Sequence, residues 1–83
     1  MRVRYFAWMK EHIGCSEEQL LLPEAVHNVS QLADYLSSLS DGHALALQNR
    51  KSVRVAVNLV FAKPDTPVTN ADEVAFFPPV TGG

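Results

Sequence analysis

The chain has 83 residues, of which 47% are hydrophobic and 19% are charged, and its formal net charge is −2. This length supports one domain with a small core and leaves no room for an enclosed active site, so any chemistry should be shared with a partner. The apolar fraction excludes a disordered chain. Its cations are spread along the sequence rather than massed, so nucleic-acid binding is not expected: Arg2, Arg4, Arg50, Lys51 and Arg54.

Cysteine content and hydropathy predict a soluble, cytoplasmic protein. Cys15 is the sole cysteine, so it cannot form an internal disulfide. The first residues, Met1 to Arg4, lack the apolar core of a signal peptide. No apolar run approaches the roughly 18 residues that span a bilayer, and no lipidation motif is present, so we expect no membrane partner.

The first quarter of the chain predicts a strand, a short helix and a returning strand. Residues 2–6 alternate charged and apolar side chains, which is typical of a half-buried strand. Residues 7–13 favour a helix, with Gly14 placed as a left-handed C-terminal cap. Residues 18–22 predict the returning strand, which Pro23 closes.

The middle of the chain predicts the main helix. Ser30 is the expected N-cap, and the helix should end near Gly42. One face carries an apolar stripe formed by Leu32, Ala33, Tyr35, Leu36 and Leu39. Residues 44–48 add a further turn, and residues 53–57 alternate valines with other side chains, as a strand with one buried face does.

The last predicted strand, residues 73–78, is apolar on both faces, which is expected in the middle of a sheet. The element order fits an α+β fold with a helix packed across one face of a mixed sheet. The first and last strands should pair in parallel through a right-handed crossover. This is the ubiquitin-like β-grasp arrangement, with a domain at residues 1–78 and a flexible tail at residues 79–83.

The tail ends in Gly82 and Gly83. A terminal carboxylate has a pKa of roughly 3.5, so it is ionised at neutral pH and must be activated before it can react. Residues without a Cβ can enter a narrow channel and adopt backbone angles that other residues avoid. We therefore expect another protein to handle this tail.

Residues 72–83 read Asp-Glu-Val-Ala-Phe-Phe-Pro-Pro-Val-Thr-Gly-Gly, and this run resembles the small subunits of molybdopterin synthase, which are ubiquitin-like sulfur carriers. Weaker support comes from Phe6-Ala7, Lys10-Glu11, Gly14, residues 44–47 and Val57-Asn58. The family often has Asp-Gly before the Asp-Glu pair. This chain has Asn70-Ala71 there, which puts the geometry of that turn in question.

The resemblance implies that an adenylating enzyme of the ubiquitin-activating type uses ATP to join the Gly83 carboxylate to AMP. A sulfur donor then converts it to a thiocarboxylate, which gives its one sulfur to cyclic pyranopterin monophosphate. Two such transfers form the dithiolene of molybdopterin. The large subunit supplies the active-site residues, in a heterotetramer with two carriers. The resemblance implies no bound cofactor and no general acid or base in this chain.

Aromatic residues near the tail root are candidates for docking on the large subunit. Phe77 points to the face opposite Phe76, and that face should also carry Phe6 and Phe61. Alternatively, these side chains cover the core, which is the favoured interpretation for Phe76. The remaining predicted partner-binding residues follow along the tail: Pro79, Val80 and Thr81.

Other patterns are weaker. His12 and Cys15 have a spacing that two metal ligands can use, but His27 and His43 follow no ligand spacing, so we expect no metal site.

Two further functions stay open. A related carrier could serve thiamine synthesis or tRNA thiolation with the same Gly82-Gly83 chemistry, and a ubiquitin-like modifier would instead acylate lysines.

Overall fold

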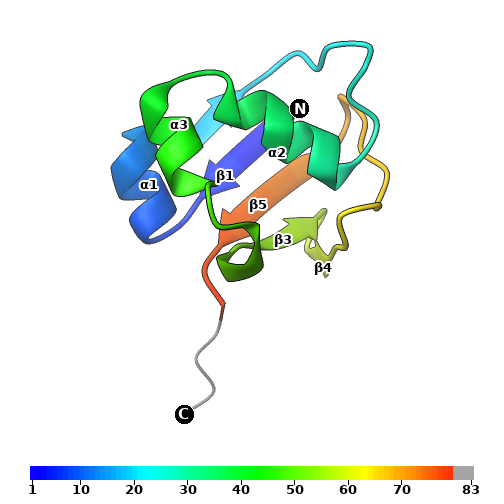
Figure 1. Ribbon diagram of the computed structural model, residues 1–83. Coiled ribbons are helices and arrows are strands. Elements are labelled where there is room, and N and C mark those ends of the chain that lie inside the picture. Colours follow the sequence, from blue (N-terminus) through cyan, green and yellow to red (C-terminus); the bar gives the residue numbers. More distant parts are fainter. Residues whose placement is uncertain (80–83) are drawn as a thin grey trace.

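The computed structural model describes residues 1–79, in which a mixed sheet carries its helices on one face (Figure 1). The strands are β1 (Arg2–Tyr5), β2 (Glu17–Gln19), β3 (Arg54–Val57), β4 (Val60–Phe61) and β5 (Glu73–Phe77). The helices are α1 (Trp8–Ile13), α2 (Val29–Ser37) and α3 (Asp41–Ala46), with a short 3-10 helix at Arg50–Ser52. The strand order is β2-β1-β5-β3-β4.

The two central strands come from opposite ends of the sequence. β1 and β5 pair in parallel, with Arg2 beside Glu73 and Tyr5 beside Phe76. β2 flanks β1 and β3 flanks β5, both in antiparallel pairing. This topology confirms the predicted β-grasp fold, and it places the end of a central strand directly before the C-terminal segment.

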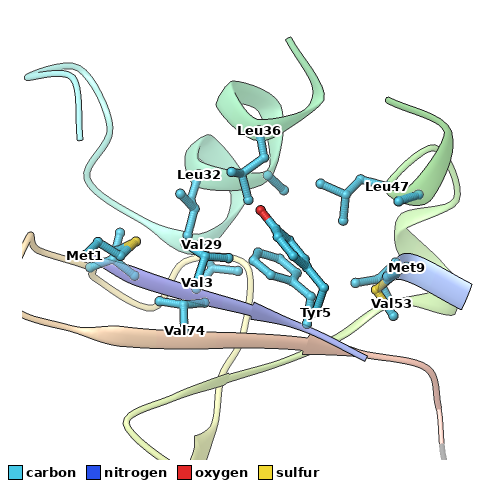
Figure 2. Close-up of a cluster of buried hydrophobic side chains, with 14 residues drawn as sticks. Met1, Val3, Tyr5, Met9, Val29, Leu32, Leu36, Leu47, Val53 and Val74 are labelled. Atoms are coloured by element: carbon cyan, nitrogen blue, oxygen red, sulfur yellow. The ribbon is translucent and has the colours of Figure 1, made fainter. Parts of the chain in front are cut away.

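The core lies between the sheet and the helices. Figure 2 shows Leu32 and Leu36 reaching from α2 toward Val3 and Tyr5 of β1. The largest fully buried side chains are Tyr5, Phe76, Met9, Leu32, Leu36, Leu47, Val3 and Val74. Burial of each such side chain contributes about 1.5–3 kcal/mol relative to leaving it exposed. The apolar stripe predicted for α2 is therefore confirmed at Leu32, Ala33 and Leu36, whereas Leu39 is 39% exposed.

One partly buried polar cluster lies at the edge of this core and links α3, β2 and β1. Glu18 Oε2 lies 2.8 Å from His43 Nε2 and accepts a hydrogen bond of 2.7 Å from the Tyr5 hydroxyl. Ser40 Oγ lies 2.7 Å from the other ring nitrogen of His43. Burial works to raise the pKa of Glu18, but the hydrogen bonds from His43 and Tyr5 outweigh it and lower that pKa. Burial and the same carboxylate raise the pKa of Tyr5.

The predicted boundaries of the main helix are wrong at both ends. Asn28 is the N-cap, because its Oδ1 accepts the Gln31 backbone N–H at 2.8 Å, and Ser30 lies inside the first turn. α2 ends at Ser37, and Gly42 belongs to α3. A Cβ on Gly42 would clash with the His12 backbone carbonyl, so this glycine allows α3 to pack closely against α1 rather than ending a helix.

The first helix and the returning strand also differ slightly from expectation. Gly14 is the left-handed C-cap that was predicted, with φ of 94°. β1 ends at Tyr5 and α1 begins only at Trp8, because Ala7, with a positive φ of 54°, lies in the tight turn between them. β2 stops at Gln19, and further along the Leu22 N–H is bonded to the Asn70 side chain instead of a strand. No helix within residues 1–79 is long and apolar enough to cross a membrane.

Candidate functional site

The candidate site begins where β5 ends. Phe77 pairs with Arg54 of β3, and Pro78 and Pro79 follow. Proline has no N–H to donate to the sheet, so strand pairing stops here. The chain then leaves the sheet at the end of β5 (Figure 1). The predicted site residues Val80, Thr81, Gly82 and Gly83 lie outside the described residues.

Three aromatic side chains lie around this exit, and we call Phe6, Phe61 and Phe77 the aromatic patch. The rings of Phe61 and Phe77 are in contact, with centroids 5.9 Å apart. The Phe6 N–H donates to the Phe76 carbonyl at 3.1 Å, which holds Phe6 beside the end of β5. Its ring lies 5.2 Å from the Arg4 guanidinium, with the geometry of a cation–π contact.

The aromatic patch is on the face of the sheet opposite the helices. Phe76 is fully buried, as predicted, whereas Phe77 is only partly buried. Phe61 is 79% exposed and Phe6 is 40% exposed. These side chains leave an apolar surface beside the tail root, and their role in docking stays a prediction.

The other end of the same face is charged. Arg2 lies 2.9 Å from Glu17 and 3.2 Å from Glu73. The hydrogen bond between Arg2 and Glu17 lowers the pKa of Glu17 and raises the pKa of Arg2. Exposed ion pairs of this kind contribute little to stability. The open face therefore has a solvated charged end and an apolar end, and the apolar end is the one beside the C-terminal segment.

The β3–β4 hairpin adds exposed apolar residues that the sequence analysis missed. Asn58 and Leu59 form its two-residue turn, with φ of 50° and 69°. Leu59 is 86% exposed and Val60 is 68% exposed. The Asn58 side chain bonds Asp72 and the Glu73 N–H, which ties the turn to β5. Asparagine between two valine-containing segments is a hairpin signal that could have revealed this turn.

A groove opens on the helix side of Phe61 and Phe77. This open groove has a volume of about 620 Å³ and runs between α2, β3 and residues 61–64. Three cations line it, Arg50, Arg54 and Lys63. These cations are spread along the sequence, and only the fold brings these three to one groove.

The remaining candidates have structural roles or none. Within residues 1–79, no group of three or more His, Cys, Asp or Glu side chains could hold a metal ion. His43 is used in the core cluster. Burial and the nearby Glu18 charge raise the pKa of the Cys15 thiol, so the reactive thiolate is disfavoured.

The fold class and the strand that leads into the C-terminal segment are those of ubiquitin-like proteins. The chain belongs to the ThiS family, whose sequence model matches residues 3–83. It is 39% identical over 83 residues to the molybdopterin synthase sulfur carrier subunit of Escherichia coli K12, covering 100% of this chain and 99% of that protein. The Haemophilus influenzae protein of the same name is 37% identical with the same coverage.

Solved structures show the same fold. SAMP1 from Haloferax volcanii superimposes with a TM-score of 0.75 at 26% identity, over 100% of this chain and 98% of that one. A putative molybdopterin converting factor subunit 1 from Pyrococcus furiosus has a TM-score of 0.74 at 27% identity, over 95% of both chains. Another H. volcanii structure, of small archaeal modifier protein 1, has a TM-score of 0.73 at 25% identity, over 96% of this chain and 97% of that one.

Proposed function

We propose that this protein is the sulfur-carrier subunit of a molybdopterin synthase, and that Gly83 carries the sulfur. The observation that carries the proposal is the 39% identity, over the whole chain, to a protein named for this function. The Phe76-Phe77-Pro78-Pro79 run favours this pathway over thiamine synthesis or tRNA thiolation. The geometry supports it, because a rigid central strand leads straight into the C-terminal segment beside an exposed aromatic patch.

The proposed chemistry takes place on the carboxylate of Gly83. An adenylating enzyme uses ATP to form an acyl-adenylate with loss of pyrophosphate, and a sulfur donor replaces AMP to give the thiocarboxylate. Sulfur is a softer nucleophile than oxygen, so the product can attack cyclic pyranopterin monophosphate. The role of this chain is to present the reactive group, and Gly82 lets it pass through a narrow channel.

The proposed partner of the aromatic patch is the large subunit, which supplies the active site. The exposed ring of Phe61 and the partly buried ring of Phe77 are in contact where a protein that encloses the tail must approach. Aromatic side chains that are desolvated at the centre of an interface contribute strongly to affinity. Pro79, Val80 and Thr81 would continue this contact along the tail, in a heterotetramer with two carriers.

Intact-mass spectrometry tests the central step. The purified chain is incubated with the adenylating enzyme of its source organism, ATP and a sulfur donor, and a parallel sample omits ATP. We expect a mass gain equal to the exchange of one oxygen for one sulfur, in the complete sample only. The thiocarboxylate form is then mixed with the large subunit and the pterin precursor, and dithiolene formation is measured. An unchanged mass in the complete reaction would refute the proposal.

A second candidate is a ubiquitin-like protein modifier, because the small archaeal modifier protein 1 of H. volcanii shares the fold. A modifier would transfer its activated C-terminus to lysine amines on other proteins. The same incubation, with cytosolic extract added, separates the two functions. Covalent conjugates that resist reduction would support the modifier, and the sulfur-containing free chain would support the carrier.

A further inference from the structure

The groove behind the aromatic patch has an apolar floor and a basic rim. Its floor includes Val53, Ala33 and Phe76, which are between 0% and 9% exposed. Its rim carries Arg50, Arg54 and Lys63. Its volume of about 620 Å³ is large enough for several side chains of a partner. Such a surface suits a ligand that is both apolar and acidic.

Charge is distributed unevenly around this groove. The whole protein has a net charge of −2 and seven Lys and Arg residues, yet three of these cations line the groove and none of its described lining residues is acidic. Arg50 is partly neutralised, because its Nη2 lies 3.0 Å from the exposed Asp34. Arg54 donates to backbone carbonyls, which leaves its positive charge uncompensated. Within residues 1–79, no ion pair involves Lys63.

The groove is continuous with the surface proposed above as the docking site. Phe61 and Phe77 belong to the aromatic patch and also line the groove. Pro79, the last described residue before the C-terminal segment, lines it as well. A protein that covers the aromatic patch and holds the tail therefore extends over the mouth of the groove.

We propose that this groove receives a segment of the large subunit in which an apolar side chain is flanked by carboxylates. The apolar side chain would pack on Val55 and Phe77, which line the groove and are only partly buried, and the carboxylates would pair with Arg54 and Lys63. This inference rests on the proposed function, because it assigns the groove to the same partner. It adds a second contact, on the helix side of the tail root, to the aromatic patch on the open face.

Charge reversal tests the basic rim. Arg54→Glu and Lys63→Glu are compared with Lys51→Glu, a control that makes the same charge change at an exposed neighbour outside the groove lining. Affinity for the purified large subunit is measured by isothermal titration calorimetry at low and at roughly 0.15 M salt, where charges interact over about 8 Å. We expect Kd to rise about tenfold or more for each rim variant, with a weaker salt dependence, and to change little for Lys51→Glu.

Filling the groove tests its occupancy without changing any charge. Ser30 lines the groove from the first turn of α2 and is only partly buried. Ser30→Tyr places a ring in the opening, and Ser30→Ala removes the hydroxyl while leaving the groove empty. We expect the tyrosine variant to weaken binding of the large subunit by about tenfold or more and the alanine variant to bind as the wild type does.

Thermal unfolding and thiocarboxylate formation are measured on every variant, so that loss of the fold or of activation is detected separately. If the rim and Ser30→Tyr variants bind the large subunit as the wild type does, the groove assignment is wrong, while sulfur loading of the wild type still supports the carrier function. Impaired adenylation with unchanged affinity for the large subunit would also overturn it, because the groove would then serve the activating enzyme. If the wild type never gains sulfur, the proposed function fails first.

Discussion

The two faces of β5 show how this small domain divides its residues. Val74 and Phe76 point toward the helices and are completely buried, whereas Phe77, one residue further on, belongs to the open face. Phe76 stacks near Tyr5 with ring centroids 6.2 Å apart, in the centre of the core. Phe77 contacts Phe61, which is 79% exposed. Adjacent residues of the same type thus have different surroundings because successive side chains of a strand point to opposite faces.

This comparison teaches that stability and recognition are carried by different sides of one sheet. The helix-facing side holds the buried residues that drive folding. The open side holds exposed aromatic residues that contribute little to folding and are available to a partner. Substitutions should therefore separate into those that unfold the domain and those that affect only its interactions.

Deletion of Gly83 should have the largest functional effect. The chain would then end one residue short, and the proposed thiocarboxylate could not reach the place where Gly83 presents it. We expect complete loss of sulfur transfer in the dithiolene assay. The core residues of the described chain lie between Met1 and Phe76, so the midpoint of thermal unfolding should not change. A large drop in this midpoint would show that folding and function are not separated in the way the two faces suggest.

Truncation on the helix-facing side should unfold the protein. Phe76→Ala removes a fully buried ring and should lower the free energy of unfolding by about 3–5 kcal/mol. Leu36→Ala, on the helix that covers the same core, should lower it by about 2–5 kcal/mol. Urea denaturation followed by circular dichroism measures both. A negligible change at Leu36 would contradict the packing of α2 on the sheet.

Truncation on the open face should act on binding instead. Phe77→Ala should weaken affinity for the large subunit by about tenfold, because it removes one of the two rings in contact at the aromatic patch. Its effect on the free energy of unfolding should be about 1 kcal/mol or less, since the ring is only partly buried. Calorimetric titration and urea denaturation of the same preparation give both numbers. An affinity equal to that of the wild type would remove Phe77 from the proposed interface.

The polar cluster at the edge of the core predicts a pH dependence of stability. The pKa of Glu18 is lower in the folded protein than its ordinary value of 4.5, so its stabilising effect is present above that value. The effect is lost as pH falls through the folded pKa, and the free energy of unfolding should decrease there. Glu18→Gln should be less stable at neutral pH and show a flatter acid limb. Glu24→Gln, at an exposed carboxylate, is the control, and an identical pH profile for both variants would contradict the role of the cluster.

The smallest expected effect is a gain in stability. Leu59 occupies a left-handed backbone position that costs a non-glycine residue about 1–2 kcal/mol. Leu59→Gly should relieve this strain and, after the larger entropy loss of glycine on folding, raise the free energy of unfolding by up to about 1 kcal/mol. Denaturant midpoints measure it. A destabilised variant would show that the exposed leucine packs in solution in a way that supports the hairpin.

The sequence predicts the architecture well because the relevant signals are local or periodic. Alternation in β1 and β3, the apolar run of β5 and the left-handed Gly14 all have their expected places. Helix ends were less predictable. Ser30 has the chemistry of a cap, but Asn28 precedes it and forms the bond, and Gly42 is required by a contact with α1 that no local pattern reveals.

The candidate site was predictable only in part, for a physical reason. Strand alternation is enough to separate Phe77 from Phe76. The groove is different, because Arg54 and Lys63 come from separate strands and loops and meet only after β3 and β4 pair. Its floor depends on the position of α2 above β3. Sequence spacing alone reveals neither the approach of Arg54 to Lys63 nor the position of α2 above β3.

The parallel pairing of β1 with β5 has a consequence for how the protein is made. The first strand to leave the ribosome has no central neighbour until one of the last segments is synthesised, so the sheet cannot close on a partial chain. Incomplete or misfolded copies lack the anchored strand that presents the C-terminal residues. Assembly of the domain thus acts as a checkpoint, since only a finished domain can present its C-terminal segment to the enzymes proposed to load it.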